Sequence, residues 1–200
     1  MIKPIEDWKT VLLDTSVIID YITDPERIVD NATRKNKIID THKLFTYFDE
    51  SSMAGKKRSL FISSITLAEL RKIESETTIV EYLMNLFNTS EVFCIDFSTE
   101  MAIPIHQHID IPNDKHLNSF IKELSDDLNR TGVYHASGWV SDDLKIVATA
   151  KYFKTRIDAV LTGDTRSFLP LAERFEVPVV NTASLPKDLF EEIDVTKSFD

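Results

Sequence analysis

The chain repeats one order of elements, in which a short apolar run is followed by a segment with helical spacing of apolar residues. The apolar runs cover residues 11–13, 60–62, 91–95, 159–162 and 178–180. Runs of this length are typical of buried strands, and consecutive parallel strands need a crossover that is usually a helix. The alternation therefore predicts an α/β fold, a three-layer α/β/α sandwich whose five-stranded parallel sheet is covered by helices on both faces.

Helices are expected between these strands and after the last of them. Ser and Thr are good N-caps, so Thr15 and Ser16 predict the start of a helix that Asp24-Pro25 ends. In the same way Ser141 predicts a helix over residues 142–153. Apolar spacing predicts the other helices at residues 38–48, 65–73, 78–87, 120–128 and 167–175.

Residues 97–137 stand apart from this alternation, since Pro104 and Pro112 interrupt any long helix there. We expect a largely helical insertion packed on the core. Residues 192–200 are expected to form a loose acidic tail. The whole of 1–200 suits one domain.

The net charge of −10 argues against a protein that grips nucleic acid over a broad basic surface. Three basic groups, at residues 34–37, 56–58 and 71–72, are expected to be plain surface. The single cysteine, Cys94, excludes an internal disulfide, is expected in the core, and fits a reducing cytoplasm. The apolar runs are too short to span a bilayer, and residues 1–9 have no apolar core typical of a signal peptide.

Two aspartates follow predicted strands directly. Asp14 ends the first strand, and Asp164 comes two residues after Thr162 at the end of the fourth. Carboxyl ends of parallel strands meet at one edge of the sheet, where functional groups gather. Each aspartate alone could equally be a turn or helix-cap residue.

Two further acids lie on predicted helices beside apolar residues. Glu69 shares a helix face with Ile65 and Ile73, and a carboxylate there is costly unless it is paired or bound to metal. Asp143 is expected in a first helical turn, where the helix dipole favours an anion. A pair between Glu69 and Lys72 or Arg71 is the alternative for the first, and simple helix-start chemistry is the alternative for the second.

Taken together, the four acids predict a shared cation. Like charges packed together repel and raise one another's pKa, and a divalent ion removes that repulsion. Oxygen ligands without Cys or His suit Mg²⁺ or Mn²⁺ rather than Zn²⁺. Such ions activate water and stabilise charge on a phosphoryl group.

Four segments carry a resemblance to the PIN-domain nucleases, and within them to the VapC-like toxin ribonucleases. They are residues 13–21, 63–70, 143–150 and 161–164 with Phe168. The resemblance implies that Asp14, Glu69, Asp143 and Asp164 are catalytic and hold Mg²⁺ or Mn²⁺, with Ser16 and Thr162 supporting them. It also implies an endoribonuclease acting on RNA through a metal-bound water, a homodimer and a cognate antitoxin. Gly163 departs from the family, in which many members carry a polar or basic residue there.

Other signals are weaker. His106, His108 and His116 lie near Asp110 and Asp114, but two histidines separated by one residue do not share a helix face, so a surface loop is expected. Trp139 is expected to pack as an apolar anchor, and base stacking is the alternative.

Two other functions stay open from the sequence. One is a catalytically silent PIN fold that serves as a binding or assembly module. The other is a phosphotransfer domain with Asp14 as phosphoacceptor, although the second Asp expected two residues later is replaced by Ser16.

Overall fold

The computed structural model of the chain describes residues 3–73, 81, 91–102, 115–133 and 135–185. Five strands form one sheet in the order β3-β2-β1-β4-β5, and all neighbours are parallel. The strands are β1 (Thr10–Leu13), β2 (Ser59–Ser63), β3 (Glu91–Ile95), β4 (Ala159–Thr162) and β5 (Val179–Asn181). The predicted parallel sandwich is confirmed, and the strands agree with their predicted ranges to within one residue.

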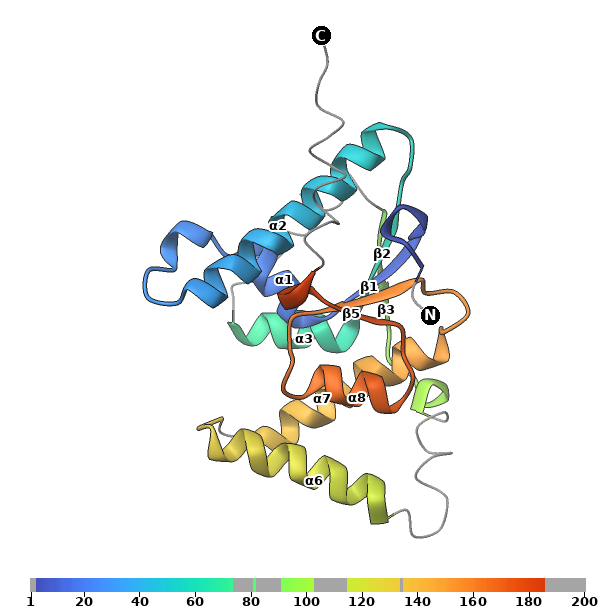
Figure 1. Ribbon diagram of the computed structural model, residues 1–200. Coiled ribbons are helices and arrows are strands. Elements are labelled where there is room, and N and C mark those ends of the chain that lie inside the picture. Colours follow the sequence, from blue (N-terminus) through green and yellow to red (C-terminus); the bar gives the residue numbers. More distant parts are fainter. Residues whose placement is uncertain (1–2, 74–80, 82–90, 103–114, 134, 186–200) are drawn as a thin grey trace.

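Helices cover both faces of this sheet (Figure 1). On one side lie α1 (Thr15–Ile22) and α2 (Ala32–Met53), and on the other α7 (Ala136–Tyr152) and α8 (Phe168–Arg174). The helix α3 (Ser64–Ile73) contacts both α1 and α7, and α6 (Lys115–Arg130) packs on the outer side of α7. Short 3-10 helices occur at Ile5–Asp7, Pro25–Arg27 and Thr182–Ser184.

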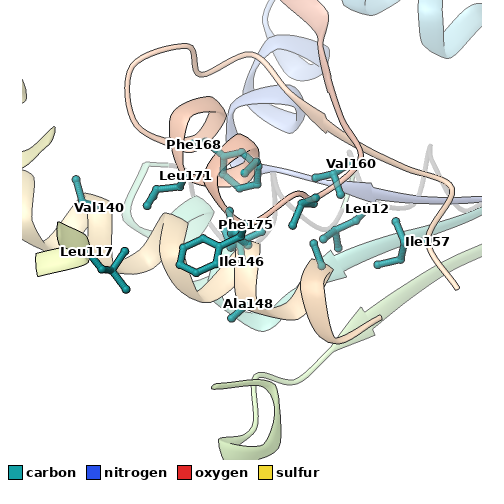
Figure 2. Packing of buried hydrophobic residues seen from close by; sticks show 14 of the residues in the cluster. Leu12, Leu117, Val140, Ile146, Ala148, Ile157, Val160, Phe168, Leu171 and Phe175 are labelled. Carbon is teal, nitrogen blue, oxygen red and sulfur yellow. The ribbon is translucent and has the colours of Figure 1, made fainter. Parts of the chain in front are cut away.

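The alternation of side chains along the strands divides the core in two. Val11 and Leu13 point to the α1–α2 side, whereas Leu12 points to the α7–α8 side, because successive strand residues face opposite ways. Figure 2 shows the second cluster, in which Leu12 and Val160 of the sheet lie near Ile146 of α7. The central strands are therefore buried on both faces, as in other parallel sheets.

The path of the chain creates a switch point between β1 and β4. The first half of the chain builds outward from β1 to β3, and the second half returns to the other side of β1. Asp14 N–H donates to Leu161 O at 3.0 Å, so the carboxyl ends of these two strands are joined directly. In open α/β sheets, ligands bind at such a point.

Several sequence expectations need correction here. Helix α7 begins at Ala136 rather than at residue 142, so Asp143 lies two turns inside the helix and not in its first turn. The N-cap of α1 is Asp14 itself, not Thr15 or Ser16. Cys94 is exposed rather than in the core.

Part of the predicted insertion is α6, whose packing on α7 adds to the second core cluster. The remaining expectations for residues 78–87, for His106 and His108, and for the tail at 192–200 lie almost entirely outside the described residues. Among the described residues, no helix combines the length and apolar character needed to cross a membrane.

Candidate metal centre at the switch point

Asp14 is the central carboxylate of the candidate site, and it is only 2% exposed. Its Oδ1 accepts from Thr15 N–H at 2.7 Å, which caps α1, and its Oδ2 accepts from Ser16 Oγ at 2.6 Å and Thr162 Oγ1 at 2.8 Å. Each hydroxyl also accepts a backbone N–H, from Gly163 to Ser16 at 2.8 Å and from Asp164 to Thr162 at 3.0 Å. These bonds lock the loop after β4 onto the end of β1.

Asp164 and Asp143 share one hydroxyl. The Ser167 Oγ lies within hydrogen-bond distance of Asp143 Oδ2 and 2.7 Å from Asp164 Oδ2. A hydroxyl has a single proton and can donate to one acceptor at a time. Ser167 can therefore satisfy only one of the two carboxylates at a time while both are ionised.

Asp164 is both a turn residue and a member of this cluster. Its Oδ1 accepts from Arg166 N–H at 2.7 Å and from Ser167 N–H at 3.3 Å, as expected for an aspartate in a turn. Its Oδ2 faces Ser167 and Asp143. Asp164 is thus a turn residue through Oδ1, while its Oδ2 lies among the carboxylates of the cavity.

Glu69 reaches the site from α3. The Thr15 hydroxyl donates to Glu69 Oε2 in a short bond that links α3 to the start of α1. The alternative pair with Lys72 does not form, since the Lys72 ammonium lies 3.6 Å from Asp142 Oδ2 instead. Asp142 also pairs with Lys145 at 2.7 Å, so it is a surface ion-pair residue beside the site.

These carboxylates face one cavity of about 210 Å³. It is bounded by α1, α3, α7 and the loop after β4. Its lining residues are Asp14, Thr15, Ser16, Ile19, Glu69, Lys72, Trp139, Asp143 and Asp164. The structure therefore brings all four predicted acids to one cavity at the switch point.

Burial and mutual repulsion define the electrostatics of the cavity. Burial raises the pKa of Asp143 well above its usual value, and the negative charge of Asp14 adds to the shift. Burial likewise raises the pKa of Asp14, although the Ser16 and Thr162 hydroxyls oppose the shift. Burial also raises the pKa of Glu69, although the hydrogen bond from Thr15 acts to lower it. Within the described residues none of these acids forms a salt bridge, so no ion pair of the chain offsets their charge when they are ionised.

The oxygen atoms of the cavity are of the kind that binds a hard cation, but they do not converge on one point as the ligands of an ion would. Its lining residues offer carboxylate and hydroxyl oxygens, the ligands that Mg²⁺ and Mn²⁺ prefer. As they stand, however, no three His, Cys, Asp or Glu side chains in the described part of the chain form a group that could hold an ion. Hydrogen bonds to Ser16, Thr162 and Ser167 occupy the oxygens that would have to converge.

A paired carboxylate lies directly beside the unpaired ones. Asp20 of α1 is 5% exposed, and its Oδ2 is 2.9 Å from Lys37 Nζ of α2. A Cβ atom at position 163 would overlap the Lys37 side chain and lie 3.0 Å from Asp20 Oδ2, so Gly163 is what leaves room for this pair. Lys37 was predicted to be a plain surface residue, which is wrong; the signal for its partner in the sequence is Asp20, one helical turn after Ser16.

Three other residues differ from their predicted roles. Trp139 is 54% exposed at the cavity instead of packed in the core. Thr15, expected as a helix cap, bonds to Glu69. Arg166, which follows Asp164 by two residues and could have reached a phosphate or been an ordinary exposed side chain, is exposed and is not among the cavity residues.

Comparisons with known proteins add little. No family model and no curated protein matches the chain. Among solved structures, it is similar to a chain in the crystal structure of VapBC2 from Rickettsia felis bound to a DNA fragment from their promoter, with a TM-score of 0.45 and 16% identity over 86% of this chain and 98% of that chain. A TM-score this low gives the match no weight for function. The class of the protein therefore rests on its own geometry, a parallel α/β sandwich with an acidic cavity at the switch point.

Proposed function

We propose that this chain is a metal-dependent endoribonuclease of the PIN type, the toxin of a toxin–antitoxin pair. One observation carries the proposal: carboxylates from four separate segments face a single cavity at the switch point of the sheet. Buried acids of like charge are costly to hold together, and perturbed groups of this kind cluster at functional sites. A shared cation would offset the repulsion between these acids and so account for their arrangement.

Asp14, Glu69, Asp143 and Asp164 would hold Mg²⁺ or Mn²⁺. The Ser167 contacts support this proposal, because one hydroxyl cannot donate to both Asp143 and Asp164 at once and a cation would offset the charge of the carboxylate left without a donor. A bound ion would supply a water of lowered pKa for attack on a phosphodiester and positive charge facing the phosphoryl oxygens.

The chain's own groups orient these acids. The hydroxyls of Ser16 and Thr162 fix the Asp14 carboxylate, and the Thr15 hydroxyl fixes Glu69. The Ser167 hydroxyl lies between Asp143 and Asp164 and holds their carboxylates close to each other. These bonds hold the acids at the cavity, and metal binding would have to redirect the bonded oxygens toward the ion.

RNA as substrate, a cognate antitoxin, a homodimer and a cytoplasmic location are proposed from the sequence resemblance around the four acids. The net charge of −10 favours a substrate held at a local site over one held along a broad basic surface. An antitoxin would act most directly by covering the cavity.

The phosphotransfer alternative lacks the second Asp expected two residues after Asp14. Ser16 stands there, and its hydroxyl donates to Asp14 Oδ2 at 2.6 Å. The silent-fold alternative differs from the proposal in ion binding, so calorimetric titration with Mn²⁺ separates the two.

The decisive experiment is cleavage of total RNA with Mg²⁺ or Mn²⁺, with EDTA as the chelated control. Asp14→Asn is expected to lower the rate at least about 100-fold, because removing one preorganised charged group at a reacting centre costs about 10²–10³ in rate. Circular dichroism checks that the variant is folded.

Asp158→Asn is the matched control, since Asp158 lies at the opposite ends of the same two strands. It is expected to cleave normally. Wild-type protein that binds Mn²⁺ but leaves RNA intact, or an Asp14→Asn variant as active as wild type, would overturn the proposal.

A further inference from the structure

Trp139 is an exposed tryptophan at the edge of the acidic cavity. It lies in the first turns of α7, is 54% exposed, and belongs to neither core cluster. The other tryptophan, Trp8, is 4% exposed, packs on Phe48, and donates its indole N–H to Lys3 O at 2.8 Å. A large aromatic ring left in water at a cavity needs a reason, since its burial is strongly favourable.

The position of Trp139 ties it to the candidate metal centre. Trp139 and Asp143 are four residues apart on α7, so their side chains share one face of the helix. Both line the cavity. The indole ring therefore lies beside the carboxylates, one helical turn toward the start of α7.

A positively charged side chain lines the same cavity. Lys72 of α3 also lines it, and its side chain is 69% exposed. The helices α3 and α7 pack against each other, so the Lys72 ammonium and the Trp139 ring belong to two adjoining walls. The Lys72 contact to Asp142, at 3.6 Å, is exposed and worth little, so the ammonium is available to an anion.

We infer that Trp139 stacks on the nucleobase next to the phosphate that enters the cavity, while Lys72 contacts the strand's phosphate backbone. The inference rests on the proposed function for the identity of that phosphate. A nucleotide strand presents a π-face and an anion at neighbouring positions, and this matches an exposed indole beside an exposed ammonium. An apolar peptide side chain would match the ring but leave Lys72 without a counter-charge.

The stacking site predicts which strands bind. A base inside a duplex is already stacked on its neighbours, so Trp139 favours unpaired nucleotides. Purines, which have the larger π-face, are favoured at this position over pyrimidines. A strand with an abasic nucleotide there keeps the phosphates and loses the contact.

The test is binding of short labelled single strands in Mg²⁺, in the Asp14→Asn background so that no strand is cut. Tryptophan fluorescence is expected to be quenched by a base-bearing strand, and to be unaffected by that strand in Trp139→Phe, which retains Trp8. Trp139→Ala is expected to bind about tenfold more weakly, since stacking contributes about 1–3 kcal/mol per base and 1.4 kcal/mol is tenfold. The abasic strand is expected to bind with the same affinity whether residue 139 is Trp or Ala.

Tyr152→Ala is the matched control, an aromatic residue on the same helix that is 44% exposed and does not line the cavity. Unchanged binding in Trp139→Ala, or equal binding of base-bearing and abasic strands, overturns the inference and leaves the ring to a protein partner. Cleavage is measured separately in chains that retain Asp14. Quenching without cleavage refutes the proposed function alone, and cleavage without quenching refutes the stacking site alone.

Discussion

The two ends of the β1–β4 pair each carry a hydrogen-bonded aspartate, but in opposite electrostatic states. At the amino ends, Asp158 accepts from Lys9 N–H at 2.8 Å and Thr10 N–H at 3.0 Å, and Lys3 Nζ lies 2.6 Å from its Oδ1. Burial alone would raise the pKa of Asp158, but these donors outweigh it and hold the pKa below its usual value.

At the carboxyl ends, Asp14 accepts three hydrogen bonds, yet burial raises its pKa. Asp158 accepts four hydrogen bonds and Asp14 three, so the number of donors alone does not account for opposite pKa shifts. Asp158 has a lysine and access to water, whereas Asp14 is fully buried and faces Asp164 and Asp143. At the amino ends, Lys3 of the chain itself pairs with the aspartate. At the carboxyl ends, the acids form no ion pair within the described residues, so a ligand is left to offset their charge.

The largest expected effect comes from Asp143→Asn. We expect cleavage to fall about 100-fold or more, while the metal-free protein becomes more stable at neutral pH because a buried and repelled charge is removed. Rates on an RNA substrate and urea unfolding in EDTA measure the two effects. A variant that loses activity and also loses stability would contradict the contrast between the two ends.

The same variant should change the pH dependence of stability. The pKa of Asp143 is raised in the folded state by burial and by the charges of Asp14, Asp164 and Glu69. The folded protein therefore holds protons that the unfolded chain releases, and stability falls as the pH rises above about 3.8 and through the raised pKa. In EDTA, wild type should lose stability over this range more steeply than Asp143→Asn, and parallel curves would refute the assignment.

Lys37→Met tests the ion pair between Lys37 and the buried Asp20 carboxylate. It leaves Asp20 buried without its ion pair, and we expect the free energy of unfolding to fall by about 2 kcal/mol, less than for a fully buried pair because Lys37 is 21% exposed. Lys35→Met is the control, since the Lys35–Glu26 pair is exposed and should cost under about 0.5 kcal/mol. Equal costs in urea unfolding would show that the Asp20 pair is not structural.

Asp158→Ala should have the smallest effect. Loss of its hydrogen bonds at the amino ends is expected to cost about 1 kcal/mol of stability, with cleavage unchanged. Thermal unfolding and an RNA cleavage assay measure this, and a large loss of activity in a folded variant would mean that the two ends are coupled.

The sheet was predictable because its signal is local. Each strand is a short apolar run, and a parallel sheet follows from the alternation with helices, so Asp14 and Asp164 could be placed at one edge. Glu69 could be found from its position among apolar helix residues.

The start of α7 was not predictable from local signals. Ser141 resembles a cap, but Ala136 and Val140 are buried in the cluster that includes Leu117 and Leu128 of α6, and this packing extends the helix toward its N-terminus. The helix starts after His135 in a left-handed conformation without a side-chain cap, which no sequence pattern indicates. The exposure of Trp139 and the Asp20–Lys37 pair likewise depend on tertiary packing.

The residue types that fit at positions 163 and 37 depend on each other, although the two positions are far apart in the sequence. The missing side chain of Gly163 is the space that Lys37 occupies, 126 positions away in a sequence of 200 residues. A Cβ at 163 would require the end of the Lys37 side chain to move, and it would lie 3.0 Å from Asp20 Oδ2 even if position 37 were shorter. We therefore expect a larger residue at 163 to accompany loss or displacement of the lysine at 37.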